Sequence, residues 1–416
     1  MAGGRRFLID GSMARSGGGF TYLVNVVPRL AARAPDDRFR LYVRSPRLAE
    51  SVPYARNLEV VKLPEVGLAA RLRFTYFEAQ RVAADWDADV YYSAGEYAPL
   101  RAHCPRIAAF RNPNVFTPVR QGWSFRQRLR LDVLHLLARA SAASCQRILF
   151  VSEDSARWIG DRIGLPESRR AVVHHGIDAE AWRGDAGAPP LDRPYVLSVS
   201  SVYRYKNFVR LIEAWAALAK RRPSTPDLVI VGDDQDPAYS ARMREARERC
   251  GALRERIHLF GEVRYRDVKR WYRGASLFVF PSYLETFGHP LLEAMASDVP
   301  LVAADIPVFR EIAGDAALYA DPYRPEALAG AMEEALYRQG AREALRKRGA
   351  ERIRRFGWDR SAAELLALFE AVRAEDRQPA PQPVRARAPR SLGWLPPGAP
   401  GPLAGRGPAQ SHRSVR

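Results

Sequence analysis

Short apolar runs alternate with amphipathic helical stretches along most of this 416-residue chain, and this order constrains the fold more than any other feature. Strands that alternate with helices form repeated βα units, which assemble into a parallel sheet with helices on its faces. The chain is also too long for one compact core. The predicted strands are residues 5–10, 39–44, 58–63, 89–93, 106–110, 147–152 and 171–174 in the first half, and 195–200, 228–232, 257–260, 276–282 and 300–304 in the second.

A polar stretch that contains Gly and Pro separates the two sets of strands and is typical of a linker. We therefore expect two Rossmann-like α/β domains that face each other across a cleft. A helical region over residues 325–374, broken near residues 356–358, follows them. The predicted parts are an N-terminal domain (1–178), a linker (179–194), a C-terminal domain (195–358), a terminal helix (359–376) and a tail (377–416).

The net charge of +18 is unevenly distributed along the chain. Residues 377–416 contain seven Arg, nine Pro and no Asp or Glu, so they contribute +7 and the remainder +11. A segment with little to bury and many prolines is expected to be disordered. It is either a solvated extension or an arm attracted to anionic lipid.

Three scattered cysteines, Cys104, Cys145 and Cys250, form neither a disulfide framework nor a metal-ligand spacing, which favours a reducing cytosol. The N-terminus lacks the apolar region of a signal peptide, and no uncharged apolar run approaches about 18 residues. We expect a cytoplasmic protein that neither spans a membrane nor is secreted by that route.

Residues 285–296 read ETFGHPLLEAMA and carry the most informative chemistry. Pro290 suits the first turn of a helix, so Glu285 is expected on the preceding loop and Glu293 inside the helix, both facing one cleft. The turn between them presents backbone N–H groups and the positive end of a helix dipole. These features predict a site for a phosphate-bearing sugar.

Two further elements suit a phosphate ligand. Gly18 and Gly19 follow the first predicted strand and precede an apolar helix, where glycines allow close approach of the backbone to a ligand. Their spacing is not G-x-G-x-x-G, which argues against the alternative of an NAD enzyme. Lys206 follows the first strand of the second domain, where its charge would neutralise a diphosphate leaving group.

Together these segments resemble the retaining family 4 glycosyltransferases, whose E-x7-E signature is close to E-x-F-G-x-P-x-x-E-A-M-A. Lys206 matches the lysine of the family's K-N loop, and residues 174–178 (HHGID) contain its H-G-I-D segment. The resemblance covers roughly residues 5–372. Two positions depart from it: Ser297 is followed by Asp298 where a Gly is common, and Ser201 stands where many members carry an Arg, a role that Arg204 could fill.

The resemblance implies a GT-B architecture, with an acceptor domain, a nucleotide-sugar domain, and terminal helices that cross back onto the first domain. It implies retaining, metal-independent transfer of a hexose from a nucleoside diphosphate sugar, without a cofactor. Its catalytic residues would be Glu285 at the donor hexose, Glu293 at the ribose and Lys206 at the diphosphate. The donor-binding residues would be Arg204, Phe287, Gly288, His289, Pro290, Leu292, Gly18 and Gly19.

The acceptor side is predicted less directly. Many family members place a His on the loop where this chain reads Arg111-Asn112, so Arg111, Asn112 and the nearby Glu96 are the candidate acceptor residues. The D-x-D pairs at residues 85–87 and 234–236 lack the context of a metal motif and are predicted to be solvated turns. We expect no obligatory metal. The acceptor is a glycan, as in polysaccharide biosynthesis, a lipid-linked sugar or a small molecule.

Residues 119–139 interleave arginines with apolar residues at helical spacing. This is either an ordinary domain helix with its leucines in the core, or a surface that docks on anionic lipid at the cytoplasmic face through Trp123, Arg126, Arg128 and Arg130. No base-reading module is present, so nucleic acid is not expected as a partner. The remaining alternatives are another GT-B enzyme, such as an epimerase or phosphorylase, and a non-catalytic sugar-nucleotide-binding protein.

Overall fold

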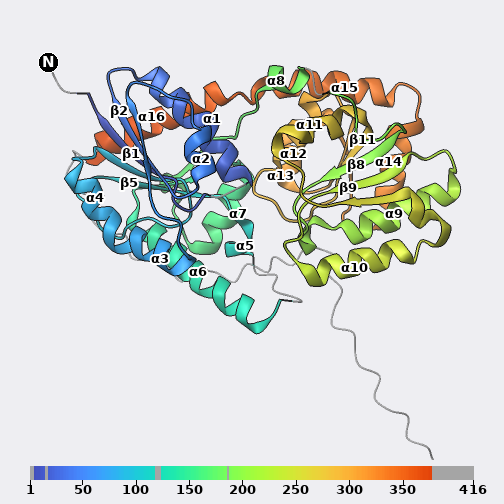
Figure 1. The fold of residues 1–416 in the computed structure, drawn as a ribbon, viewed down its shortest axis with the longest axis horizontal. Helices are drawn as coiled ribbons and strands as arrows, with labels where there is room; N and C mark the ends of the chain where they lie inside the picture. Colours follow the sequence, from blue (N-terminus) through green and yellow to red (C-terminus); the bar gives the residue numbers. More distant parts are fainter. Residues whose placement is uncertain (1–3, 15–16, 118–122, 185–186, 377–416) are drawn as a thin grey trace, which may run out of the picture.

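The computed structural model describes residues 4–14, 17–117, 123–184 and 187–376, which form two α/β domains (Figure 1). The predicted tail and residues 119–122 of the basic segment lie outside the described residues. Every strand pairing among the described residues of the two sheets is parallel, as alternating βα units require.

The N-terminal domain has a seven-stranded sheet in the order β3-β2-β1-β4-β5-β6-β7. Its strands are β1 (Arg6–Asp10), β2 (Arg38–Val43), β3 (Leu58–Lys62), β4 (Val90–Ser93), β5 (Arg106–Phe110), β6 (Arg147–Phe150) and β7 (Arg170–Val172). Its helices are α1 (Gly17–Arg33), α2 (Pro46–Ser51), α3 (Leu68–Arg73), the π-helical turn Phe74–Glu78, α4 (Ala79–Asp85), α5 (Pro113–Phe116), α6 (Phe125–Ser144) and α7 (Glu153–Ile163).

The C-terminal domain has a six-stranded sheet in the order β10-β9-β8-β11-β12-β13. Its strands are β8 (Tyr195–Val199), β9 (Asp227–Val231), β10 (Ile257–Phe260), β11 (Ala275–Phe280), β12 (Leu301–Ala304) and β13 (Ala317–Ala320). Its helices are α9 (Phe208–Arg221), α10 (Pro237–Glu248), α11 (Tyr265–Gly274), α12 (His289–Ala296), α13 (Pro307–Ala313), α14 (Pro325–Tyr337) and α15 (Ala341–Arg352), and the short α8 (Ala179–Arg183) precedes the domain.

The order of strands reverses between β1 and β4 in the first sheet and between β8 and β11 in the second. Open parallel sheets bind ligands at the carboxyl ends of the strands beside such a switch point, because the adjacent loops diverge there. The predicted Gly18, Lys206 and Glu285 segments follow β1, β8 and β11. The topology therefore gathers the loops predicted to bind the ligand.

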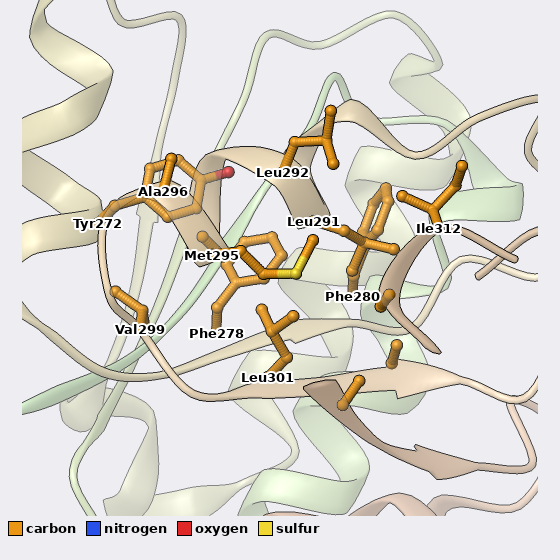
Figure 2. Packing of buried hydrophobic residues seen from close by; sticks show 14 of the residues in the cluster. Tyr272, Phe278, Phe280, Leu291, Leu292, Met295, Ala296, Val299, Leu301 and Ile312 are labelled. Atoms are coloured by element: carbon orange, nitrogen blue, oxygen red, sulfur yellow. The ribbon is translucent and has the colours of Figure 1, made fainter. Parts of the chain in front are cut away.

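The helix that carries Glu293 is packed into the core of the second domain (Figure 2). Leu291 and Met295 lie between α12 and the side chains of Phe278 and Leu301, and all four are at most 2% exposed. A helix with apolar side chains on nearly all sides is stable only when it is buried. This packing holds α12 rigidly behind the turn that precedes it.

The last helix, α16 (Trp358–Asp376), crosses back onto the first domain, as the resemblance implied (Figure 1). Phe369 packs 5.2 Å from the Phe7 ring and 5.3 Å from the Tyr92 ring, measured between centroids. The Ile177 N–H donates to the Phe356 carbonyl at 3.1 Å, so residues 176–177 run in contact with the segment that leads into this helix. A Cβ on Gly176 would overlap the backbone of Trp358, and only glycine fits that approach.

Strand β13 was not among the predicted strands. Its sequence ALYA is half alanine, a residue that is depleted in strands, and it lies at the edge of the sheet. The predicted terminal helical region is broken at Gly340 as well as near residue 356, because Gly340 adopts φ 75°. The basic helix starts at Phe125, where Ser124 and Gln127 form a capping box.

We predict that Gly176→Ala lowers the free energy of unfolding by about 1 to 3 kcal/mol, because the added methyl group forces residue 176 and the start of α16 apart. Gly330→Ala in α14 is the matched control, since its added methyl meets no atom within 4 Å. In a helix that change should stabilise the protein by about 0.5 to 1 kcal/mol. Equal denaturation midpoints for the two variants would contradict the tight approach at Gly176.

Candidate active site

Lys206 and Glu285 form a buried ion pair at the switch point of the second sheet. Nζ of Lys206 lies 2.5 Å from Oε1 of Glu285, and each side chain is 11% exposed. The Lys206 ammonium also lies 5.0 Å from the Tyr205 ring centroid and 5.3 Å from that of Phe280. A charge pair with so little water around it is costly to bury, and coupled ionisable groups of this kind cluster at functional sites.

The loops after β8 and β11 are joined by their own hydrogen bonds, which set the position of this pair. The Ser282 hydroxyl and the Tyr283 N–H both donate to the Tyr205 carbonyl at 3.0 Å. Asn207 adopts φ 65°, and its amide nitrogen donates to the Pro281 carbonyl at 3.1 Å. The ion pair is therefore held by backbone geometry from two adjacent strands.

The turn between the two predicted carboxylates has the form that the sequence indicates. Gly288 adopts φ 88°, and a Cβ there would lie 2.7 Å from a ring carbon of Phe309. Helix α12 begins at His289 with Pro290 in its first turn, and no side chain caps its N-terminus. Pro290 has no N–H and the Leu291 N–H donates to the Gly288 carbonyl at 2.9 Å, so an anion would meet the remaining N–H groups of the first turn and the positive end of the helix dipole.

Glu293 lies deeper in the site, 5% exposed, and accepts a hydrogen bond of 2.9 Å from the Tyr272 hydroxyl. Burial raises the pKa of Glu293 to about 7, although hydrogen bonds from Tyr272 and Tyr265 oppose that shift. The neighbouring Leu292 is fully buried in the core, so its side chain does not line the site.

The Arg204 guanidinium is held in an ion pair. Its guanidinium lies 3.0 Å from Asp236, with exposures of 19% and 15%, and Asp236 also accepts from the Tyr239 N–H at the start of α10. The prediction that the 234–236 pair is a solvated turn was therefore wrong for Asp236. Asp87, with its side chain 83% exposed, is such a turn residue. Within the described ranges, no three His, Cys, Asp or Glu side chains gather in a metal-binding arrangement.

The predicted acceptor residues shape a loop of the first domain. Oε1 of Glu96 accepts from the N–H groups of Arg111 at 3.0 Å and Asn112 at 2.8 Å. Oδ1 of Asn112 accepts from the Asn114 N–H at 3.1 Å and caps α5. Glu96 and Asn112 thus hold the loop in place. Gly18 and Gly19 lie in the first turn of α1, where a Cβ on Gly18 would meet no atom.

A cavity of about 250 Å³ opens where the two domains meet. Its walls combine polar and aromatic side chains from both domains, which include Asn112, Trp123, Arg130, Tyr203, Arg204 and Asp236. Trp123 and Arg130, which one of the two sequence interpretations assigned to a lipid-docking surface, thus line this cavity.

Two family descriptions match the chain in succession: "Glycosyltransferase Family 4" over residues 16–181 and "Glycosyl transferases group 1" over residues 182–352. Together they span both domains and the site between them. The chain belongs to the group 1, family 4 glycosyltransferases.

Several curated relatives of this glycosyltransferase are known. The O-antigen chain mannosyltransferase B of Escherichia coli is 25% identical over 84% of this chain and 95% of that protein. The phosphatidyl-myo-inositol mannosyltransferase of Mycolicibacterium smegmatis is 26% identical over 76% of this chain and 80% of that protein.

Solved structures confirm the GT-B fold. Sucrose-phosphate synthase from Thermosynechococcus elongatus superposes with a TM-score of 0.68 at 19% identity, and the match covers 89% of this chain and 100% of that one. Anabaena HepE in complex with UDP-glucose superposes with a TM-score of 0.69 at 16% identity, covering 88% of this chain and 99% of that one. No helix in the described part of this glycosyltransferase is long and apolar enough to cross a membrane.

The sequence did not predict the contacts that join the two domains at the site. The Glu311 carboxylate accepts from the N–H groups of Glu153 and Asp154, at 2.8 and 2.9 Å, and so caps α7 from the other domain. Nε2 of His174 lies 2.8 Å from the same carboxylate. The Thr286 hydroxyl donates to the Arg111 carbonyl at 2.6 Å. No local pattern marks these partners, because each pair is far apart in the chain.

We predict that this glycosyltransferase binds UDP or GDP more tightly as the pH rises from 6 to 8. Ionised Glu293 is the better acceptor for ribose hydroxyls, and its pKa of about 7 is above the ordinary value. Loss of the proton over this range should therefore strengthen binding by up to about tenfold. Titration calorimetry at each pH measures the effect.

The matched control is Glu293→Gln, which removes the titrating group and keeps the shape. Because the terminal phosphate of the nucleotide itself titrates near pH 6, the difference between the two proteins isolates Glu293. Parallel pH profiles for wild type and variant would contradict the assignment.

Proposed function

We propose that this protein is a retaining, metal-independent hexosyltransferase that uses a nucleoside diphosphate sugar. The observation that carries the proposal is the buried Lys206–Glu285 pair beside the uncapped N-terminus of α12, with Glu293 behind it. A cation, a helix dipole and two carboxylates match the charges and hydroxyls of such a donor. That relatives are named as mannosyltransferases, and that one structure holds UDP-glucose, supports this donor class.

In this proposal Lys206 exchanges its contact with Glu285 for the donor diphosphate. Glu285 is then released to accept hydrogen bonds from hexose hydroxyls, and Glu293 accepts them from the ribose. The bond between the sugar C1 and the phosphate oxygen breaks while the acceptor oxygen bonds to C1 on the same face. The acceptor proton passes to the departing phosphate. Positive charge from Lys206 and the α12 N-terminus stabilises that leaving group without a metal.

We predict that Lys206→Ala and Glu285→Gln each lower the transfer rate by about a hundredfold to a thousandfold, since each removes a group that contacts the transition state. The matched control is Lys220→Ala, an exposed lysine at the end of α9. Release of UDP or GDP from a panel of nucleotide sugars, with and without candidate acceptors, measures the rate. Near-normal turnover in folded Lys206→Ala protein would overturn the site assignment.

The same assay separates the alternatives. Release of free nucleotide only when an acceptor is present supports a transferase and contradicts an epimerase. Retention of configuration at C1, read by NMR of the product, tests the stereochemical part of the proposal. Activity should survive EDTA, and a complete loss that a divalent ion restores would show that a metal takes part.

We further infer that a face of α6 docks on an anionic membrane surface, where a lipid-linked acceptor would be found. Four apolar side chains remain exposed along one side of this helix: Phe125 (73%), Leu129 (53%), Val133 (47%) and Leu136 (62%). Their spacing of three and four residues aligns them. Arg126, Arg128 and Arg139 are also exposed on this helix, and each basic residue near such a surface contributes about 1 kcal/mol of attraction.

This surface overlaps the one expected from sequence, which ran from Trp123 to Arg130, and extends along α6 to Val133 and Leu136. We predict that the wild type sediments with anionic vesicles, less so at high salt, and that the triple change Phe125→Ser, Leu129→Ser, Leu136→Ser weakens binding. Tyr54→Ser is the matched control, because Tyr54 is 92% exposed elsewhere. Equal recovery with neutral and anionic vesicles would exclude this surface and favour a soluble acceptor.

A further inference from the structure

Arg111 is a largely buried cation that lacks a counter-charge. Its Nη2 donates to the Tyr92 hydroxyl at 2.7 Å, and its guanidinium carbon lies 3.6 Å from the Tyr22 ring centroid. Its Nε and Nη1 are buried without a hydrogen-bond partner. Among the described residues, no carboxylate lies within ion-pair distance of this guanidinium. Burying a cation and two donors in this way is costly unless a ligand satisfies them.

Two imidazole side chains near Arg111 also have buried nitrogen atoms without a hydrogen-bond partner. His175 is 6% exposed and its Nε2 has no partner, while both ring nitrogens of His289 are buried and unpartnered. The His175 ring lies 5.3 Å from that of Tyr22, on which Arg111 stacks, and 6.0 Å from that of His289. Three side chains from separate segments, around Tyr22 and the start of α12, therefore carry buried nitrogen atoms without hydrogen-bond partners.

The cluster lies beside the proposed leaving-group site. Thr286 donates to the Arg111 carbonyl at 2.6 Å, while the adjacent Glu285 holds Lys206. His289 is the first residue of α12, so the unsatisfied nitrogens accompany the uncapped N–H groups of that helix. Arg204, the cation expected to assist Lys206, is instead paired with Asp236. Arg111, whose backbone carbonyl bonds to this turn, belongs to the other domain.

We propose that Arg111, His175 and His289 form an anion site that takes a phosphate group. A phosphate oxygen set accepts several hydrogen bonds at once and supplies the missing counter-charge, which suits a guanidinium above all. The inference rests on the proposed function, because the phosphate comes either from the donor diphosphate or from a phosphorylated acceptor that meets it in the cleft.

Titration calorimetry with UDP, GDP and inorganic phosphate tests this site in Arg111→Gln and Arg111→Lys. Loss of a charge-assisted contact should weaken binding of the relevant probe by about tenfold to a hundredfold in Arg111→Gln, with a smaller loss in Arg111→Lys. Arg338→Gln is the control, since Arg338 pairs with Glu334 on the surface of α14 and should leave binding unchanged. Uridine, which has no phosphate, should bind wild type and variant alike.

The two sources of phosphate give different results. If the site takes the donor diphosphate, Arg111→Gln weakens UDP or GDP binding, and saturating nucleotide abolishes the binding of inorganic phosphate. If it takes an acceptor phosphate, nucleotide binding is unchanged, and inorganic phosphate binds the nucleotide-saturated wild type but not the variant. Wild-type affinity of Arg111→Gln for all three probes overturns the site. Failure of the wild type to bind either nucleotide would instead count against the proposed function, and the phosphate arm would still decide the anion site.

Discussion

Hydrogen bonds between the two domains at the carboxyl edges of their sheets create the candidate site. Glu311 of the second domain caps α7 of the first, and Thr286 bonds to the Arg111 carbonyl beside it. The Ser152 hydroxyl donates to the Thr286 carbonyl at 2.6 Å, so the turn is held from the first domain on two sides. These bonds satisfy groups of both domains that would otherwise need water as their partner.

The charged side chains of the site share one property, which is that little water surrounds them. Lys206 and Glu285 neutralise each other, Glu293 relies on Tyr272, and the Arg111 guanidinium has no carboxylate among the described residues. Under the proposed function, a polyanionic, hydroxyl-rich ligand would give each of these groups a partner. These contacts would then favour a sugar nucleotide over neutral sugars, and electrostatic preorganisation would supply most of the rate.

Much of the fold followed from local pattern. Strand periodicity predicted every strand except β13, whose alanines carry little strand signal, and Pro290 marked the start of α12. The E-x7-E spacing predicted Glu285 and Glu293 as site residues and the K-N loop predicted Lys206, and the structure brings Lys206 and Glu285 into contact. The ion pair of Arg204 with Asp236 and the burial of Leu292 could not be predicted, because both depend on residues distant in sequence.

By itself the sequence determined the two parallel-sheet domains, the turn at Gly288 and the family to which the chain belongs, because each is encoded by residues close together in the chain. Only the tertiary structure decided which cation approaches the turn, which helix Glu311 caps and which side of α6 stays exposed. Thr286 and Arg111 are 175 residues apart, and no local pattern records their contact. The physical reason is that pairing of charges and burial of a helix face depend on what the folded chain brings opposite them.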